Sequence, residues 1–173
     1  DQIRCWLGEF DSLSASLSHV ALTRSEVEDS FSLRFRLASG LEGVLQQSSA
    51  AMGGMTEIIR VAGSEGSIWI DQGAVYFADR HGERVLPIDA DITLPEPPSI
   101  GDDPRQQRLD WQIMAAVEIA PYTQLCRSLY AAIKGEAAPS PVPLATFKDG
   151  VANMRVMDAI RASAHRNGEL VRT

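Results

Sequence analysis

Apolar and polar residues alternate along several short stretches of the chain, with the period of two that is typical of β-strands. The alternation is clearest over residues 30–37, where four large apolar residues oppose two serines and two arginines. Residues 12–19 alternate apolar residues with serines and predict a half-buried strand. Glycine-bearing turns separate the further predicted strands, which cover residues 41–49, 57–62, 67–71, 74–79 and 84–88.

The last third of the chain has helical spacing instead. Residues 105–134 are predicted to be mostly helical with an interruption near Pro121, and one apolar stripe of this segment is expected to pack. A second helix is predicted to begin at the capping-box sequence 146–149 and to end at 167–168, with an edge strand over 169–173. The stripe of the first helix consists of Leu125, Leu129 and Ile133, and the predicted buried face of the second consists of Phe147, Val151, Met154, Met157 and Ile160.

Strands that precede helices favour an α+β fold, with a largely antiparallel, open-faced β-sheet and helices packed on one face. All 173 residues are expected to form a single domain. Residues 3–7 predict a short helix that Gly8 ends; because so short a helix is marginal alone, we expect its beginning to lie before residue 1. Residues 89–104 hold four of the nine prolines and predict a long surface loop of the kind that often carries function.

Composition narrows the possible partners. The net charge of −7 argues against nucleic-acid binding, which needs a basic face. No apolar run approaches the roughly 20 residues that span a bilayer, so no membrane partner is expected. Cys5 and Cys126 predict either reduced thiols in a cytoplasmic protein, which is the simpler interpretation, or one disulfide. The three histidines lack metal-ligand spacing, so no metal site is predicted.

Few residues stand out as candidates for chemistry. No phosphate-binding glycine fingerprint is present, and the glycines of residues 63–66 predict a hairpin turn. Asp149 has two interpretations, as the cap of the second helix or as a group that faces a ligand cleft. Tyr122 and Trp111 follow the long loop and would either pack in the domain or line a polyol pocket. The crossing at residues 52–55 would be a plain loop or a pocket wall.

Arg34 and Arg36 lie on the polar side of the strand over residues 30–37. A sheet covered by helices on one face leaves its other face open. Such a face is either solvated or used as a symmetric contact between subunits. Alternation of residues does not decide between these two interpretations.

Five segments occur in an order that is typical of one family of two-domain enzymes, and it is their order that makes the match specific. They are residues 1–8 (DQIRCWLG), 43–48 (GVLQQS), 61–70 (VAGSEGSIWI), 122–135 and 147–163. On these segments the chain resembles the C-terminal domain of the Gfo/Idh/MocA oxidoreductases, the family of glucose–fructose oxidoreductase and inositol dehydrogenase.

The resemblance implies that the chain is the C-terminal substrate-binding and oligomerisation domain of an enzyme whose N-terminal Rossmann domain binds NAD or NADP. The catalytic lysine and histidine of the family would precede residue 1, and Asp1 matches the last residue of the H-x-x-D pattern, which implies a supporting role. By position, Tyr122 and the 52–55 crossing with Met55 match segments that line the substrate pocket in relatives. The family's sheet commonly forms the dimer or tetramer contact, which favours Arg34 and Arg36 as interface residues.

The resemblance thus implies that the chain is part of an NAD(P)-dependent sugar or cyclitol dehydrogenase that transfers a hydride at a secondary alcohol. Its partners would be a sugar or polyol, its own Rossmann domain and further copies of itself. Alone, the chain is expected to bind no cofactor and to be inactive. The substrate-binding residues would be Tyr122, Trp111, Met55 and Asp149. The alternative is a non-catalytic dimeric binding domain that has no cofactor partner.

Overall fold

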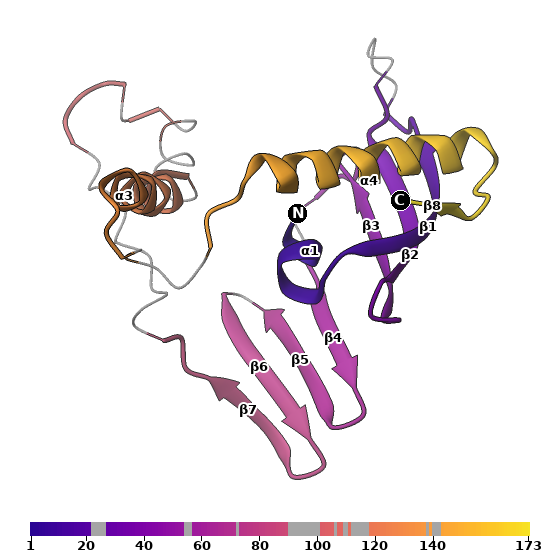
Figure 1. The fold of residues 1–173 in the computed structure, drawn as a ribbon, viewed down its shortest axis with the longest axis horizontal. Helices are drawn as coiled ribbons and strands as arrows, with labels where there is room; N and C mark the ends of the chain where they lie inside the picture. Colours follow the sequence, from indigo (N-terminus) through magenta and orange to yellow (C-terminus); the bar gives the residue numbers. More distant parts are fainter. Residues whose placement is uncertain are drawn as a thin grey trace. The chain divides into compact units, whose positions relative to one another are not determined.

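A computed structural model of the chain describes residues 1–21, 27–53, 57–71, 73–89, 101–105, 107–108, 111, 118–137, 139 and 143–173. The chain divides into two compact units, one of Asp1–Gly54 with Ala145–Thr173 and one of Met55–Leu144. Each unit contains one four-stranded antiparallel sheet (Figure 1). The α+β fold class predicted from the sequence is confirmed, with two sheets where one was expected. Met55 and residues 90–100 of the predicted loop lie outside the described residues.

The sheet of the first unit has the strand order β3-β2-β1-β8. Its strands are β1 (Phe10–Ser18), β2 (Ser30–Leu37), β3 (Glu42–Ser48) and β8 (Val171–Arg172). The alternation of β1 and β2 puts Leu13 opposite Phe35 and Ala15 opposite Leu33, and all four side chains are buried. The boundaries predicted for β2 are confirmed, and so is the edge position of the last strand, where β8 pairs with β1.

Two helices complete the first unit. The short helix α1 (Gln2–Leu7) ends at Gly8, whose φ of 103° only glycine adopts readily. The long helix α4 (Phe147–His165) packs on β1 and crosses one face of the sheet (Figure 1). It begins at the predicted capping box of Thr146 and Asp149 and ends at His165, just before the predicted end at 167–168, where Asn167 and Gly168 have positive φ.

The face predicted to be buried on α4 is wrong in most of its residues. Phe147, Val151, Met154 and Met157 are exposed, Phe147 at 97%, and only Ile160 of the predicted set packs against the core. The side of α4 that meets the sheet has the small residues Ala159 and Ser163 buried, and Val156 and Ile160 pack against the same core. Small side chains at the buried positions let the helix backbone approach the strands closely.

The second unit contains a meander of the strands β4 (Ile59–Gly63), β5 (Gly66–Asp71), β6 (Ala74–Asp79) and β7 (Gly82–Leu86). The predicted hairpin turn at residues 63–66 is confirmed, because Gly63 pairs with Gly66 at the end of β4 and β5. Across β5 and β6, the rings of Trp69 and Tyr76 stack with centroids 5.5 Å apart. Cross-strand aromatic pairs of this kind stabilise antiparallel sheets.

The helix α3 (Ala120–Lys134) also belongs to the second unit. Pro121 lies in its first turn, where a missing N–H costs no hydrogen bond, and Gly135 ends it with a φ of 70°. The stripe that was predicted to pack is exposed, and the buried residues of α3 are Ser128 and Ala131. Hydrophobic periodicity therefore identified the apolar stripe of this helix, but that stripe is not the side that is buried.

Candidate functional site

Arg4 of α1 is the centre of a polar cluster that we call the Arg4 cluster, formed with Asp1, Glu9, Asp149 and Asn153. Only 6% of the Arg4 side chain is exposed. Its Nε and Nη2 atoms donate to the two carboxylate oxygens of Glu9 at 2.8 and 2.6 Å, which is the bidentate geometry of a strong ion pair. The hydrogen bonds with Arg4 hold the pKa of the Glu9 carboxyl below its ordinary value.

The remaining donors of Arg4 reach the ends of both helices. Nη1 donates to Asp1 Oδ1 at 3.0 Å, to the backbone carbonyl of Asp149 at 3.1 Å and to Asn153 Oδ1 at 3.3 Å. Nη2 also reaches Asp149 Oδ1 at 3.5 Å. Asp1 and Asp149, which the sequence singled out separately, are therefore held by one guanidinium group.

The capping role predicted for Asp149 is confirmed. Its Oδ2 accepts hydrogen bonds from the backbone N–H and the hydroxyl of Thr146, both at 2.7 Å. These two bonds, and then the charge of Arg4, hold the pKa of the Asp149 carboxyl below its ordinary value. At neutral pH this carboxylate is thus ionised and is suited to accept hydrogen bonds, whereas it is a poor proton acceptor. Whether it also contacts a ligand stays a prediction.

Sequence reasoning missed Arg4 and Glu9. The available signal was the placement of an arginine three residues after Asp1 in a short helix, which allows an i, i+3 ion pair. The contact between Arg4 and Asp149 joins residues 145 positions apart. No local pattern in the sequence reports a contact over that distance.

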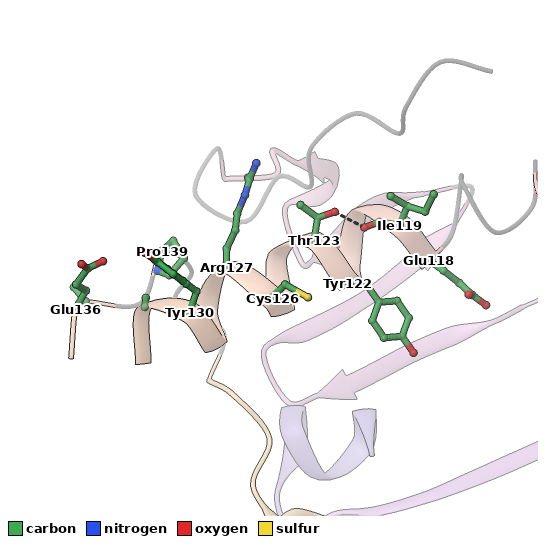
Figure 2. Close-up of a pocket in the computed structure, with 11 residues that line it drawn as sticks. Glu118, Ile119, Tyr122, Thr123, Cys126, Arg127, Tyr130, Glu136 and Pro139 are labelled. Atoms are coloured by element: carbon green, nitrogen blue, oxygen red, sulfur yellow. Dashed lines mark hydrogen bonds between the residues drawn. The ribbon is translucent and has the colours of Figure 1, made fainter. Parts of the chain in front are cut away.

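A groove runs along α3 and includes Tyr122 in its lining (Figure 2). Its volume is about 760 Å³. Tyr122 is 61% exposed, and its ring points to one side of the helix while Thr123 and Arg127 point to the other. The Thr123 hydroxyl donates to the carbonyl of Ile119 at 2.7 Å, which leaves the hydroxyl of Tyr122 as the more available polar group of this turn.

The structure says less about the other predicted substrate-binding residues. Trp111 is half-buried and precedes α3 in the second unit. Asp149 belongs to the first unit, and its role in substrate binding stays a prediction. Met55 lies outside the described residues.

Arg34 and Arg36 lie on the face of β2 opposite to α4, and both side chains are exposed. Glu42 of β3 pairs with Arg34 at 2.8 Å and with Arg36 at 3.8 Å. The hydrogen bond to Glu42 raises the pKa of Arg34, and the same bond lowers the pKa of Glu42. This face therefore carries two arginines that share one carboxylate, and its role as an interface stays a prediction.

Two classes of site receive no support from the part of the chain that the structure describes. No three or more histidine, cysteine or acidic side chains in these ranges are grouped so that they could hold a metal ion. Among the described helices, none has the length and apolar character that crossing a membrane requires. Cys5 of the first unit and Cys126 of the second unit are both free thiols and exposed.

Comparison with known proteins gives a partial family match and an extended match in fold. Residues 1–69 match the family model described as the GFO/IDH/MocA C-terminal domain. A search among curated protein sequences gives no match. Similar solved structures share the fold over nearly the whole chain while the sequence identity stays low.

Three of these structures illustrate the likeness. An oxidoreductase from Agrobacterium radiobacter, in complex with NAD+, L-tartaric acid and magnesium, matches 98% of this chain and 45% of its own with a TM-score of 0.70 and 18% identity. Levoglucosan dehydrogenase with NADH and levoglucosan matches 100% and 47% of the two chains, with a TM-score of 0.63 and 22% identity. An inositol dehydrogenase homologue with NAD+ from Azotobacter vinelandii matches 95% and 43%, with a TM-score of 0.66 and 20% identity.

The chain spans about half the length of these solved structures. The match of residues 1–69 agrees with the first three of the five segments on which the resemblance was based. Together with the shared fold, this match confirms that the chain resembles the C-terminal domain of the Gfo/Idh/MocA oxidoreductases.

Proposed function

We propose that the chain is the substrate-binding and oligomerisation domain of an NAD(P)-dependent sugar or cyclitol dehydrogenase. The observation that carries this proposal is the match of 98% of the chain to 45% of an NAD+-bound oxidoreductase, with a TM-score of 0.70. The longer protein of which this chain would be one domain is called the parent protein below. In it, a hydride would pass between a secondary alcohol carbon and the nicotinamide. Its location would be cytoplasmic, in keeping with two free thiols.

The described residues of the chain do not fit a dinucleotide. Such a site needs a glycine-rich turn from a strand into a helix, with the pyrophosphate at the helix N-terminus. The turn at Gly63–Gly66 instead joins two antiparallel strands. At the N-terminus of α4 the Asp149 carboxylate already accepts the hydrogen bonds from Thr146, and its negative charge would repel a phosphate. The proposal therefore assigns the cofactor to a separate domain of the parent protein.

The contribution of this chain would be to position the substrate. Tyr122, with Trp111 and Met55, would form the pocket, since Tyr122 offers an exposed hydroxyl and an apolar ring at the groove on α3. Asp149 would accept a hydrogen bond from a substrate hydroxyl, and Asp1 would support the catalytic groups of the proposed cofactor domain. A sugar or polyol suits such a pocket because it needs hydrogen-bond acceptors for its hydroxyls and an apolar surface for its C–H faces.

A direct test uses the parent protein. Its purified form should reduce NAD+ or NADP+ in the presence of levoglucosan, inositol or related polyols, followed by the absorbance of the reduced cofactor. A parent protein without any cofactor domain, or one that binds a polyol and leaves the cofactor unreduced, would favour the alternative of a non-catalytic binding domain.

The first prediction concerns cofactor binding by the chain alone. Isothermal calorimetry of the isolated chain should detect no micromolar binding of NAD or NADP, because its helix N-terminus and glycine turns lack a phosphate site. The parent protein, measured at the same concentrations, is the positive control. Micromolar binding by the isolated chain would contradict the assignment of the cofactor to another domain.

The second prediction concerns Tyr122. In the parent protein, Tyr122→Phe should lower kcat/KM by about fivefold, which corresponds to about 1 kcal/mol for one lost neutral hydrogen bond. Folding stability should barely change, because the side chain is 61% exposed. Tyr76→Phe is the control, since Tyr76 also lies in the second unit, on β6, and is not among the residues that line the groove. Full activity of Tyr122→Phe would show that the hydroxyl of Tyr122 does not bind the substrate.

The third prediction concerns assembly. We propose that the open face of β2 and β3 forms a two-fold contact, as a dimer or as part of a tetramer. Arg34→Glu should then raise the dissociation constant at least about tenfold in light-scattering measurements, because like charges meet across the axis. The double variant Arg34→Glu, Glu42→Arg restores the ion pair within the chain, and it separates loss of the contact from loss of the local pair. An unchanged dissociation constant in both variants would exclude this face.

A further inference from the structure

Arg4 is the one charged residue that is buried within the part of the chain that the structure describes. A buried guanidinium is costly to desolvate unless its donors are satisfied. Here every nitrogen of the group has an acceptor: Glu9 takes Nε and Nη2, and Asp1, Asp149 and Asn153 share Nη1. The guanidinium group of Arg4 therefore has a single orientation, which its two hydrogen bonds to Glu9 fix.

That orientation connects two places in the chain that the proposed function uses. Asp1 precedes α1, and Asp149 lies in the first turn of α4. Arg4 contacts Asp149 both at its backbone carbonyl and at its carboxylate, so it holds the turn of the helix as well as the side chain. An apolar residue at position 4 would supply packing, but it would not direct either carboxylate.

The charges of the cluster explain why a cation is needed. The side chains of Asp1, Glu9 and Asp149 together carry three negative charges, and within the Arg4 cluster Arg4 is the only side-chain cation that pairs with them. Without it the carboxylates would repel one another and turn toward water, which is open to them because 40–61% of their side-chain surfaces are exposed. The carboxylate of Asp149 would keep its bonds to Thr146 and lose its fixed relation to Asp1.

We propose that Arg4 is a positioning residue for substrate binding: it locks the first turn of α4, with Asp149, against the end of α1 that carries Asp1. The proposal rests on the proposed function, in which Asp149 borders the substrate. Arg4 itself is enclosed by its five acceptor groups, and it acts through Asp149 and not by contact with the substrate.

The first measurement uses the isolated chain and hydrogen exchange followed by NMR. In Arg4→Met, the Gly150 N–H, which is bonded to the carbonyl of Thr146 at 3.2 Å, should lose at least about tenfold more protection than the Gly168 N–H, which is bonded to Ser163 at 2.9 Å. A loss of global stability alone would lower the protection of both amides by the same factor. Arg4→Lys keeps the charge but lacks the planar guanidinium group. The difference in lost protection between the two amides should therefore be smaller than in Arg4→Met, although still present.

The second measurement uses the parent protein, with levoglucosan and inositol as the sugar and cyclitol probes. Arg4→Met should raise KM about tenfold and leave kcat within about twofold, because the interaction lost is one that orders the bound ground state. Arg161→Met is the matched control: it removes an exposed ion pair with Asp158 on the same helix α4 and should change neither parameter. If Arg4→Met does not fold, Glu9→Gln loosens the guanidinium while keeping its charge and should raise KM about threefold.

The outcomes separate this inference from the proposed function. A parent protein that oxidises a polyol, with a KM that neither Arg4→Met nor Glu9→Gln changes, overturns the positioning role alone. Equal loss of protection at Gly150 and Gly168 overturns it as well. A parent protein that oxidises no polyol overturns the proposed function, and the substrate role of Arg4 with it.

Discussion

Ser163→Ala is expected to lower the free energy of unfolding by about 2 to 3 kcal/mol, a large effect for the loss of one oxygen atom. Ser163 is fully buried on the side of α4 that faces the sheet. Its hydroxyl accepts a hydrogen bond from the backbone N–H of Ala15 at 2.9 Å and donates one to the carbonyl of Glu169 at 2.7 Å.

The reason for the large effect is the shortness of β8. This strand pairs with β1 only at Ser12 and Leu13, so the N–H of Ala15 lies beyond the end of the ladder. The Ser163 hydroxyl replaces the missing strand partner at that position. Alanine would leave the Ala15 N–H without an acceptor at a residue that is only 3% exposed, where water has little access.

Urea unfolding at equilibrium measures this prediction, and Ser16→Ala is the control. Ser16 lies on the exposed side of β1, where its hydroxyl meets that of Ser32 at 3.0 Å, so its loss should cost less than about 0.5 kcal/mol. If Ser163→Ala were as stable as Ser16→Ala, the hydroxyl could not be the partner that completes the edge of the sheet.

Gly66→Ala is expected to destabilise the sheet of the second unit by at least about 3 kcal/mol. Gly66 has a φ of 156°, and a Cβ atom at this position would collide with the backbone carbonyl oxygen of Ala78 and touch the ring of Phe77. Backbone atoms of a central strand cannot move aside without breaking the pairing of β5 with β6. The ring of Phe77 occupies the space that a side chain at position 66 would need.

The glycine directly opposite provides the control. Gly63 pairs with Gly66 across the same turn, yet an added Cβ there would find its nearest atom at 3.9 Å. Gly63→Ala should therefore cost less than about 1 kcal/mol. The indole N–H signal of Trp69, which stacks on Tyr76 in this sheet, reports the unfolding of each variant in urea. Equal stabilities would show that the sheet tolerates a side chain at position 66.

The strands were predictable because the buried and exposed faces of a half-buried strand give an alternation of apolar and polar residues in the sequence. β2 and β6 have the predicted boundaries, and the capping box at Thr146 located the start of α4. The faces of the helices were not predictable in the same way. On α3 and α4 the enclosed residues are small, such as Ser128 and Ser163, whereas hydrophobic periodicity gives most weight to large side chains.

The candidate site was predictable only in part. Asp149 was recognised because a helix cap is a local pattern. Its link to Asp1 depends on Arg4, whose contacts cross from α1 to α4 and arise only when the fold is complete. The division of the strands between two sheets likewise depends on pairing between strands, which alternation within each strand does not specify.

The outward side of α4 has a consequence for how association of this chain should be studied. Phe147, Val151 and Met154 leave a large apolar area in water on a helix whose other side is already packed. Contacts through this area would strengthen on warming and on addition of sulfate, since their driving force comes from the release of water. Contacts through the face of Arg34 and Glu42 would weaken as salt is added, because ions screen exposed charges. The opposite responses to salt therefore distinguish association through the charged face of Arg34 and Glu42 from association through the exposed apolar side of α4.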